Sequence, residues 1–378
     1  MFRFIHTSDW QIGKVFRFVD EKTMGLLQRA RLDAITRIGQ HAQAQDARCV
    51  LVAGDVYDME ALAPQSLMQP LERMRAFEDV AWHLIPGNHD PHRPNGLWDQ
   101  LTPRLPPNVH VHTAPEPAEI GDGAAVLLPA PLHRKQALED PTAFMDDAET
   151  RAELPRIGLA HGSITAFDTA GTSTPNLIAP DRPARANLAY LALGDWHGQK
   201  QINARCWYAG TPETDAFDVD GGGGALLVAL GGPDDAPAVT QLETGIYTWQ
   251  PRRVHIASHD DIAQLADTLR NAATTPDRLL VDLTVEGTLS LADRRSFEET
   301  IETSVAAALC HLRVHDANLL AEPTRADLDS IDRGGFVRAA AERLLEQAET
   351  GDGEDSKLAQ DALRRLYLEH KKLEAKKQ

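Results

Sequence analysis

A series of short polar motifs between residues 9 and 197 carries side chains that could bind metal ions. They follow one another in the order Asp9-Trp10-Gln11, Gly54-Asp55, Gly87-Asn88-His89-Asp90, His161-Gly162 and Gly194-Asp195-Trp196-His197. Carboxylate, amide and imidazole groups are hard oxygen and nitrogen donors, which suit Mn²⁺ or iron better than a metal that prefers thiolates. Two divalent ions held close together activate water and stabilise charge on a phosphoester. The series therefore predicts a site for paired metal ions.

The motifs differ in how specific they are. A Gly-Asp pair occurs by chance in many chains, and a single histidine such as His161 is more often a core residue than a ligand. Gly87-Asn88-His89-Asp90 is more specific, because polar residues that close an apolar run give the fold no advantage. Its structural alternative is a tight turn with a left-handed asparagine. Asp55 is the candidate bridge between the ions, since the preceding glycine allows close approach of the backbone.

Short apolar runs precede the motifs and predict the strands that position them. We expect strands over residues 1–9, 48–53, 80–85, 157–160 and 188–193, and helices over residues 21–46 and 64–77. Alternation of strands and helices indicates an α/β layered fold, in which functional groups gather at the carboxyl ends of strands. Strand-rich segments at 109–132 and 205–245 place sheet on both sides of the core and end the first domain at residue 245.

A second pattern follows the first domain. Residues 250–322 predict a small α+β cap domain with strands at 253–257, 279–285 and 311–315 and helices at 260–273 and 291–308. Residues 334–372 predict a helical pair in which each helix carries an apolar stripe. The stripe either packs on the chain's own domains or docks a helix of a partner protein.

Composition narrows the class of protein. The formal net charge of −18 opposes non-specific coating of nucleic acid but leaves room for a local polyanion site built around cations. The three cysteines are far apart and form no metal or disulfide pattern. No leader peptide pattern and no membrane-length apolar run is present. We expect a cytoplasmic protein with no membrane association.

The ordered motifs resemble the calcineurin-like metallophosphoesterases over residues 1–245. Within that family the chain is similar to the SbcD and YhaO branch of DNA repair nucleases, which the phrase Tyr208-Ala209-Gly210-Thr211-Pro212-Glu213 also resembles. The resemblance implies a four-layer β-sandwich flanked by helices, with the cap and the helical pair appended. It also implies DNA as substrate, a coiled-coil ATPase similar to SbcC or YhaN docked on residues 334–372, and a homodimer.

The resemblance assigns roles to the motif residues. It implies one metal ion on Asp9, Gln11, Asp55 and His197, and a second ion on Asp55, Asn88, His161 and Asp195. It makes His89 the catalytic histidine, which assists the leaving oxygen or stabilises the transition state. It places Asp90 behind His89 as the residue that orients the imidazole.

Two positions depart from the family pattern, which usually has histidine where this chain has Gln11 and Asp195. The site loses two imidazoles and gains a third carboxylate beside Asp9 and Asp55. We expect a harder, more anionic site that favours Mn²⁺, with Mg²⁺ or Fe²⁺ as alternatives. The other interpretation is that one ion binds weakly and activity falls.

Three functions are compatible with these motifs. The leading hypothesis is a Mn²⁺-dependent DNA exonuclease or endonuclease in a repair complex. A second is a small-molecule phosphodiesterase or phosphatase of the same fold, which needs neither helical pair nor ATPase. A third is a weakly active structural subunit whose main task is to bind the ATPase.

Overall fold

The computed structural model describes residues 1–164, 175–321, 335–350 and 353–375. The chain forms two compact units, Met1–Thr248 and Trp249–Gln378. Each unit has its own buried apolar core.

The first sheet of the first unit contains the N-terminal strand among its inner strands. Its order is β14-β13-β1-β2-β3-β4, in which β1 to β4 run parallel to one another and β13 is antiparallel to both β1 and β14. The strands are β1 (Phe2–Thr7), β2 (Cys49–Val52), β3 (Ala81–Leu84), β4 (Val109–Val111), β13 (Gly224–Leu230) and β14 (Ala238–Glu243). The inner strand β2 is wholly apolar because both of its faces are buried.

The second sheet supplies the remaining motifs. Its order is β11-β12-β10-β7-β6-β5, with β6, β7, β10 and β12 parallel and the edge strands β5 and β11 antiparallel. The strands are β5 (Ala118–Ile120), β6 (Ala125–Ala130), β7 (Arg156–His161), β10 (Tyr190–Gly194), β11 (Lys200–Asn203) and β12 (Cys206–Tyr208). A pair of very short strands, β8 (Ser163–Ile164) and β9 (Leu177–Ile178), follows β7.

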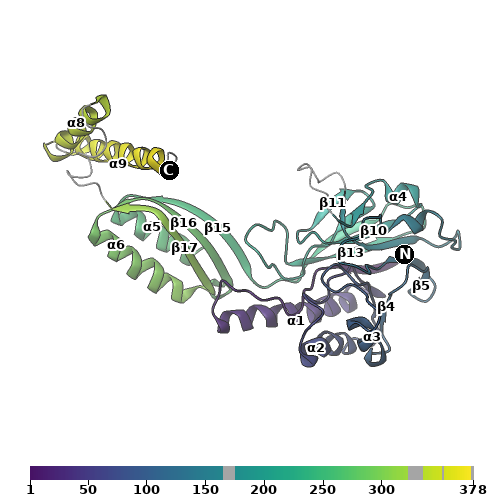
Figure 1. Cartoon of the computed structure of the whole chain (residues 1–378). Helices are drawn as coiled ribbons and strands as arrows, with labels where there is room; N and C mark the ends of the chain where they lie inside the picture. Colours follow the sequence, from purple (N-terminus) through teal and green to yellow (C-terminus); the bar gives the residue numbers. More distant parts are fainter. Residues whose placement is uncertain (165–174, 322–334, 351–352, 376–378) are drawn as a thin grey trace. The chain divides into compact units, whose positions relative to one another are not determined.

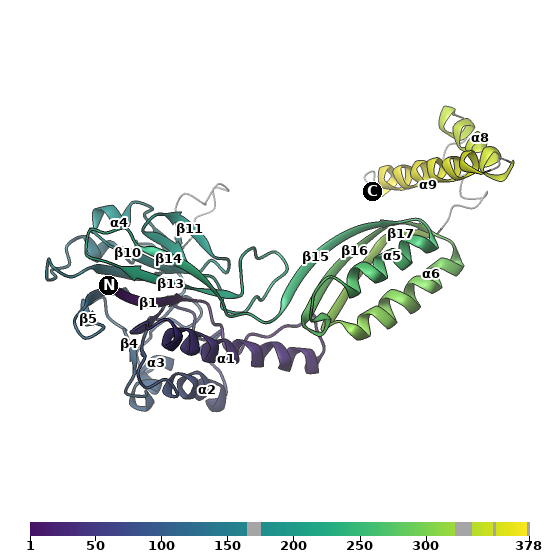
Figure 2. The same cartoon turned by 180° about the vertical axis from the view of Figure 1, so that it is seen from behind.

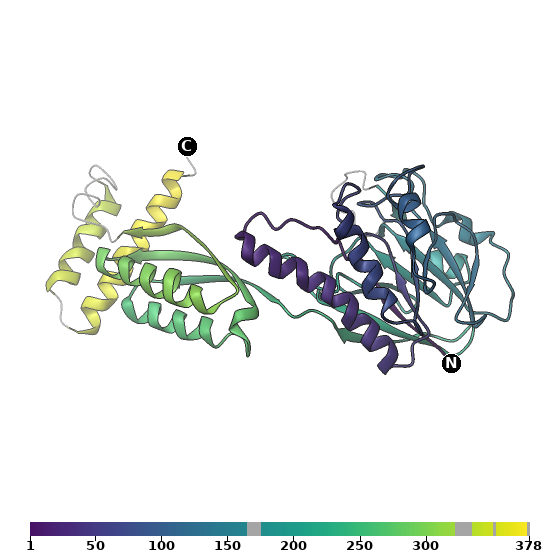
Figure 3. The same cartoon turned by 90° about the horizontal axis from the view of Figure 1, so that it is seen from below.

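Side chains of the two sheets meet in a common core. Phe4 and Leu51 from the first sheet pack with Leu159, Tyr190 and Ala192 from the second. On its other face the first sheet packs against α1 (Glu21–Ala44) and α2 (Pro64–Arg75), which lie side by side in Figure 3. Short helices, α4 (Arg182–Arg185) among them, accompany the outer face of the second sheet (Figures 1 and 2). The predicted layered α/β sandwich flanked by helices is confirmed.

The short connecting helices complete the first unit. They are α3 (Leu97–Leu101) with the 3₁₀ turn η1 (Thr102–Arg104), and the 3₁₀ turn η2 (Ala143–Asp146). Trp98 of α3 is buried, and its indole Nε1–H donates to the carbonyl oxygen of Asp90. The helix thus anchors the segment that follows the Gly-Asn-His-Asp motif.

Parallel strand direction brings the motifs to one edge. Asp9 follows β1, Asp55 follows β2 and Asn88 follows β3, while His161 ends β7 and Asp195 follows β10. Because these strands run in the same direction within each sheet, their carboxyl ends lie together. The fold therefore delivers every predicted motif to one region of the first unit.

The second unit contains a three-stranded sheet of order β15-β16-β17. Its strands are β15 (Thr248–Ile256), β16 (Leu279–Leu289) and β17 (His311–Ala321), all longer than the sequence predicts. Helices α5 (His259–Arg270) and α6 (Leu291–Phe297) cover one face (Figure 1). A 3₁₀ turn, η4 (Pro276–Arg278), leads into β16.

The expected helix 291–308 is wrong in detail. Only α6 is α-helical, and the chain then continues as a π-helix, η5 (Glu298–Val305), and a 3₁₀ turn, η6 (Ala306–Ala308). The Thr303 hydroxyl donates to the carbonyl oxygen of Glu298, five residues earlier, which matches the wider winding. Ile301 and Val305 remain buried against the sheet, so packing is retained despite the changed helix type.

The helical pair consists of α8 (Phe336–Thr350) and α9 (Glu354–Ala375). Part of each apolar stripe is used within the second unit, where Ala341, Leu363 and Tyr367 are buried and Leu320 of β17 packs against them. Residue 334, the first of the predicted segment, and the side chain of Leu368 lie outside the described residues. Among the described residues, no helix is long and apolar enough to cross a membrane.

Candidate metal centre

The loops after β1 and β2 are joined by backbone hydrogen bonds. The N–H of Asp9 donates to the Gly54 carbonyl oxygen at 3.1 Å, and the N–H of Gln11 donates to that of Asp55 at 2.9 Å. Asp9, Gln11 and Asp55 all have positive φ angles, of 54°, 41° and 54°. This left-handed backbone is uncommon outside glycine, so the tertiary contacts must hold it in place.

Two glycines allow the loops to approach closely. A Cβ atom on Gly87 would lie 2.2 Å from Asp55 Oδ1, and one on Gly54 would lie 2.4 Å from His161 Nδ1. Both distances are far below van der Waals contact, so a larger residue at either position would displace a site residue. The glycines of the Gly-Asp and Gly-Asn-His-Asp motifs are therefore part of the geometry of the site.

The centre of the site is a buried cluster of Asp9, Asp55 and His161. One potential ligand atom from each residue lies within 4.8 Å of the others. All three side chains are almost fully buried. Two carboxylates without a compensating cation would be costly at such a position, so the arrangement is that of a divalent metal site.

Two buried atoms beside this cluster have no hydrogen-bond partner. They are Asn88 Oδ1 and His161 Nε2. The Nδ1 of His161 lies 2.8 Å from the Ala53 carbonyl oxygen, which can only accept, so Nδ1 carries the proton of the neutral ring. The Nε2 lone pair then faces Asp55 Oδ1 at 3.6 Å and Asp195 Oδ1 at 3.7 Å. A cation between these atoms would satisfy all of them, and the residues therefore fit a metal ion.

The electrostatic field at His161 agrees with this assignment. Burial lowers the pKa of His161, but the carboxylates of Asp55, Asp9 and Asp195 outweigh burial and raise it to about 9. The surrounding field thus favours positive charge on or beside the imidazole.

Asp195, which follows a strand of the second sheet, contacts site residues that follow strands of the first sheet. Its carboxylate accepts from Ser163 Oγ at 2.6 Å and from Asn88 Nδ2 at 3.4 Å. Its backbone N–H faces the carboxylate of Asp9 at 3.2 Å, and its φ angle is 105°. These contacts bring the Asp195 oxygens toward Asn88 and His161.

Gln11 has a different environment from the one that the sequence predicts. Its Oε1 accepts from Lys14 Nζ at 3.1 Å, and its Nε2 lies 3.2 Å from His197 Nε2. The atom expected to bind metal is thus engaged by a lysine. Gln11 thus lies beside the cluster, but its side-chain oxygen faces Lys14.

His197 is positioned by a buried carboxylate. Its Nδ1 lies 3.0 Å from Asp215 Oδ1, so Nε2 carries the lone pair of the neutral ring, which the Gln11 amide nitrogen faces at 3.2 Å. Burial alone would raise the pKa of Asp215, but contacts with His197, Arg31 and Lys14 lower it well below its usual value. Asp215 is therefore a fixed negative charge behind the imidazole.

The predicted role of Asp90 needs correction. Its carboxylate accepts from the backbone N–H groups of Gly87 at 2.7 Å and Tyr57 at 3.0 Å. His89 is oriented by Asp58 instead, whose carbonyl oxygen lies 2.8 Å from His89 Nδ1. Asp90 thus fixes the loops after β2 and β3 through backbone N–H groups, while the His89 imidazole is held by the Asp58 carbonyl oxygen.

His89 lies at the surface of the site. Its side chain is 36% exposed, whereas the metal-binding candidates around it are mostly buried. Its backbone N–H donates to Asp55 Oδ1 at 2.9 Å, which ties it to the cluster. The imidazole can therefore meet a substrate without having to bind the metal.

Several supporting residues were not predicted from the sequence. Buried Arg31 of α1 donates to the carbonyl oxygens of Trp10, Asp9 and Glu213. A charged residue within the apolar stripe of that helix was the available signal. Asp215, Ser163 and Lys14 carried no such signal, because their roles depend on contacts distant in sequence.

The phrase 208–213 acts as a scaffold for the site. The Thr211 hydroxyl donates to the carbonyl oxygen of Asp9, and Tyr208 Oη donates to that of Gly162. The Glu213 carboxylate accepts the N–H groups of Ile246 and Tyr247 and pairs with Arg37. The phrase therefore connects the metal loops to the end of the first unit.

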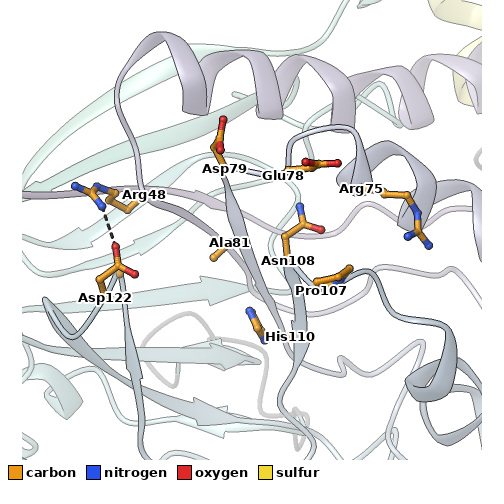
Figure 4. A pocket seen from close by; sticks show the side chains of 10 residues that line it. Arg48, Arg75, Glu78, Asp79, Ala81, Pro107, Asn108, His110 and Asp122 are labelled. Atoms are coloured by element: carbon orange, nitrogen blue, oxygen red, sulfur yellow. Dashed lines mark hydrogen bonds and ion pairs between the residues drawn. The ribbon is translucent and has the colours of Figure 1, made fainter.

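A cavity of about 640 Å³ lies elsewhere in the first unit (Figure 4). Arg48 precedes β2 and Ala81 opens β3, so the cavity adjoins the amino ends of the strands, opposite the motifs. Its lining includes an ion pair of Arg48 with Asp122 at 2.9 Å. None of the predicted site residues lines it, so this cavity is separate from the metal cluster.

Comparison with known proteins agrees with the chemistry of the cluster. The sequence profile of the family described as calcineurin-like phosphoesterase matches residues 2–186. This chain contains a calcineurin-like metallophosphoesterase domain. A metallophosphoesterase is a hydrolase that acts on phosphoester bonds. In this domain Asp9, Asp55 and His161 form a buried cluster suited to divalent metal ions.

More distant comparisons add little to this metallophosphoesterase assignment. The crystal structure of TT1561 from Thermus thermophilus is similar at 12% identity and a TM-score of 0.39, covering 64% of this chain and 98% of that one. No curated protein matches the chain.

Proposed function

We propose that this metallophosphoesterase is a Mn²⁺-dependent DNA nuclease of the SbcD and YhaO type. It would hydrolyse phosphodiester bonds with two metal ions and act with a coiled-coil ATPase similar to SbcC or YhaN. The observation that carries the proposal is the set of potential ligand atoms around Asp55. One atom each from Asp9 and His161 lies within 4.8 Å of an Asp55 oxygen, and the unpartnered Asn88 Oδ1 and His161 Nε2 support a second position.

The residues divide into two groups around Asp55. Asp9 and His197 would hold the first ion, and Asn88, His161 and Asp195 the second, with Asp55 shared between them. Bound divalent ions would supply a nucleophilic water and stabilise the charge that develops on the phosphoryl oxygens. The oxygen-rich donor set, with imidazole as its nitrogen donor, supports Mn²⁺ over a metal that prefers thiolates.

His89 is the residue placed to act on the substrate itself. Its Nδ1–H is bound to the Asp58 carbonyl oxygen, so Nε2 is the basic nitrogen of the neutral ring. When protonated, Nε2 can donate to the leaving oxygen of the phosphodiester or to a phosphoryl oxygen. Its exposure and its link to Asp55 support this role.

The second unit supports a macromolecular substrate. On β15, Arg253 and His255 alternate with Val254 and Ile256, which pack toward α5 and α6. The Arg253 guanidinium, which pairs with Glu286 at 3.5 Å, and the His255 imidazole therefore lie on the sheet face opposite the helices. We infer that this cap guides DNA, a task that hydrolysis of a small ester does not require.

The helical pair supports a protein partner. Internal packing leaves Phe336, Val337 and Leu358 exposed, with Phe336 at 87% and Leu358 at 70%. Exposed apolar side chains on paired helices match the stripe that an amphipathic partner helix covers. We infer that the coiled-coil ATPase docks on α8 and α9.

The negative net charge of the chain lowers the affinity that we expect for DNA. With a net charge of −18, the protein repels DNA at long range. We therefore expect weak DNA binding by the protein alone, and tighter binding once the ATPase is present.

The proposal is tested by comparing substrates at one enzyme concentration. End-labelled single-stranded and duplex DNA, and bis-p-nitrophenyl phosphate, are incubated with the full chain and Mn²⁺. We expect cleavage of DNA and of the ester, both abolished by EDTA and by Asp55→Asn. Hydrolysis of the small ester without DNA cleavage, with and without the ATPase, would support the small-molecule enzyme instead. Absence of both reactions would support a structural subunit.

A further inference from the structure

Four side chains next to the first metal position form a closed ring of hydrogen bonds. Lys14 Nζ lies 3.1 Å from Gln11 Oε1 and 2.5 Å from Asp215 Oδ2. Gln11 Nε2 lies 3.2 Å from His197 Nε2, and His197 Nδ1 lies 3.0 Å from Asp215 Oδ1. The ring connects the loop after β1 to the loop after β10 and to the segment after β12.

The chemistry of the donors fixes how the ring is arranged. A lysine ammonium has donors only, so the Gln11 atom that faces it must be the oxygen. The amide nitrogen then faces His197 and donates to its Nε2 lone pair. The His197 Nδ1–H donates to Asp215, which can only accept. Each contact in the ring therefore has one donor and one acceptor.

This arrangement affects the two metal positions differently. The second position retains its donors, since Asn88 Oδ1 and His161 Nε2 have no other partner and Asp195 lies beside them. The first position keeps Asp9 and Asp55, but the Gln11 oxygen is engaged by Lys14 and the His197 Nε2 lone pair accepts from the Gln11 amide. An ammonium close to a divalent ion also repels it.

We propose that Lys14 holds Gln11 out of the first metal position, which makes that position the weaker of the two. Lys14 is then a positioning residue that separates the affinities of the two sites. The inference rests on the proposed function only in assuming two divalent ions, and it is independent of the substrate.

Asp215 keeps Lys14 in place without weakening the rest of the ring. Its side chain is fully buried, and Arg31 Nη1 lies 3.4 Å from Oδ2. Removing the lysine charge leaves Asp215 with Arg31 and His197 as partners. We therefore expect Lys14 variants to fold and to keep His197 oriented.

The test is a calorimetric titration of the metal-free full chain with Mn²⁺. For the natural protein we expect a tight site and a weak site. Lys14→Met should tighten the weak site about tenfold and leave the tight site unchanged, because it removes one charge and releases the Gln11 oxygen. Lys22→Met, which removes an exposed lysine from the first turn of α1, is the matched control and should change neither site.

A second variant separates charge from ligation. Gln11→Ala should not weaken the weak site, since the Gln11 oxygen is not a ligand while Lys14 is present and loss of the amide frees His197 Nε2. Circular dichroism of each variant checks the fold, and Lys14→Gln provides a second neutral side chain if Lys14→Met is unstable.

The inference is overturned by two equal sites in the natural protein, by loss of one site in Gln11→Ala, or by unchanged or weaker binding in both neutral Lys14 variants. A single ion in the natural protein, with a second appearing in Lys14→Met, supports it. A single ion in every variant overturns it. Because Mn²⁺ binding is measured without substrate, failure to cleave DNA would count against the proposed nuclease function and leave this result standing.

Discussion

At the scale of single residues, unusual backbone conformations coincide with the proposed metal ligands. Asp9, Asp55 and Asp195 have φ angles of 54°, 54° and 105°, in a region that costs a non-glycine residue about 1–3 kcal/mol. Hydrogen bonds between the loops offset this cost. The Asp195 N–H, for example, faces the Asp9 carboxylate. The carboxylates are therefore already gathered before an ion arrives.

His89 offers the clearest separation of catalysis from metal binding. His89→Ala should lower the rate of phosphodiester hydrolysis about 10²–10⁴-fold, the range for loss of a general acid or base. Mn²⁺ stoichiometry should stay the same, because the contact with Asp55 is made by the His89 backbone. Steady-state kinetics and metal analysis of the purified variant check both parts. Unchanged kcat in a preparation free of contaminating hydrolase would refute the assignment.

The candidate site was predictable to the extent that its residues follow strands. Asp9, Asp55, Asn88, His161 and Asp195 could be recognised because each is a polar residue that follows or closes an apolar run typical of a strand. The hydrogen bond from Lys14 to Gln11 could not be predicted from the sequence, since the residues around Gln11 do not show whether its oxygen binds a metal ion or a neighbouring side chain. Asp58 was missed as the partner of His89 for a different reason: its backbone carbonyl, not its side chain, makes the contact.

At the scale of elements, α1 supports the metal loops through one buried side chain. Arg31 bonds the backbone carbonyl oxygens of Asp9 and Trp10 and lies near Asp215. Arg31→Met should lower the free energy of unfolding by about 3–5 kcal/mol, because it leaves a buried carboxylate with fewer partners. Urea denaturation measures this loss. Arg29→Met on the exposed face of the same helix is the control, and equal losses in both variants would contradict the account.

The contact between β1 and β10 makes stability depend on pH. His6 is buried between them, with Nδ1 3.0 Å from Tyr190 Oη and Nε2 3.1 Å from the Leu193 carbonyl oxygen. Burial lowers the pKa of His6 from 6.5 to about 3, against a rise caused by the Leu193 contact. Between these values the unfolded chain binds a proton that the folded chain refuses. Stability should therefore fall as pH decreases from 6.5 towards 3.

The contribution of His6 is about 1.4 kcal/mol per pH unit within that window. His6→Gln should reduce the pH dependence of the free energy of unfolding by one proton between pH 4 and 6. Denaturation curves at several pH values measure the slope. An unchanged slope in this variant would show that His6 titrates alike in both states.

The elements themselves differ in how far sequence could predict them. Inner strands such as β2 and β10 were predictable because both faces are apolar. Their assignment to two separate sheets was not, since strand pairing depends on long-range contacts. The full length of β16 was not predicted. The π-helical winding of η5 was not predicted either, because a burial pattern alone does not define helix type.

At the scale of the whole molecule, the two units have separate cores. Phe4 and Tyr190 belong to the core of Met1–Thr248, whereas Leu283 and Phe297 belong to that of Trp249–Gln378. A fragment of residues 1–248 should therefore remain folded and bind Mn²⁺ with the stoichiometry of the full chain. Limited proteolysis followed by calorimetry of the fragment tests this. A fragment that is unfolded or does not bind Mn²⁺ would show that the second unit completes the first.

The proposed two-ion site depends on Asp55, whose carboxylate would be shared by both ions. Electron paramagnetic resonance of the full chain at saturating Mn²⁺ tests it most directly, because two bridged Mn²⁺ ions couple magnetically. We predict the spectrum of a coupled pair at two ions per chain, replaced by that of isolated Mn²⁺ in Asp55→Asn. A spectrum of isolated Mn²⁺ in the natural protein at saturation, unchanged by Asp55→Asn, would contradict the two-ion site.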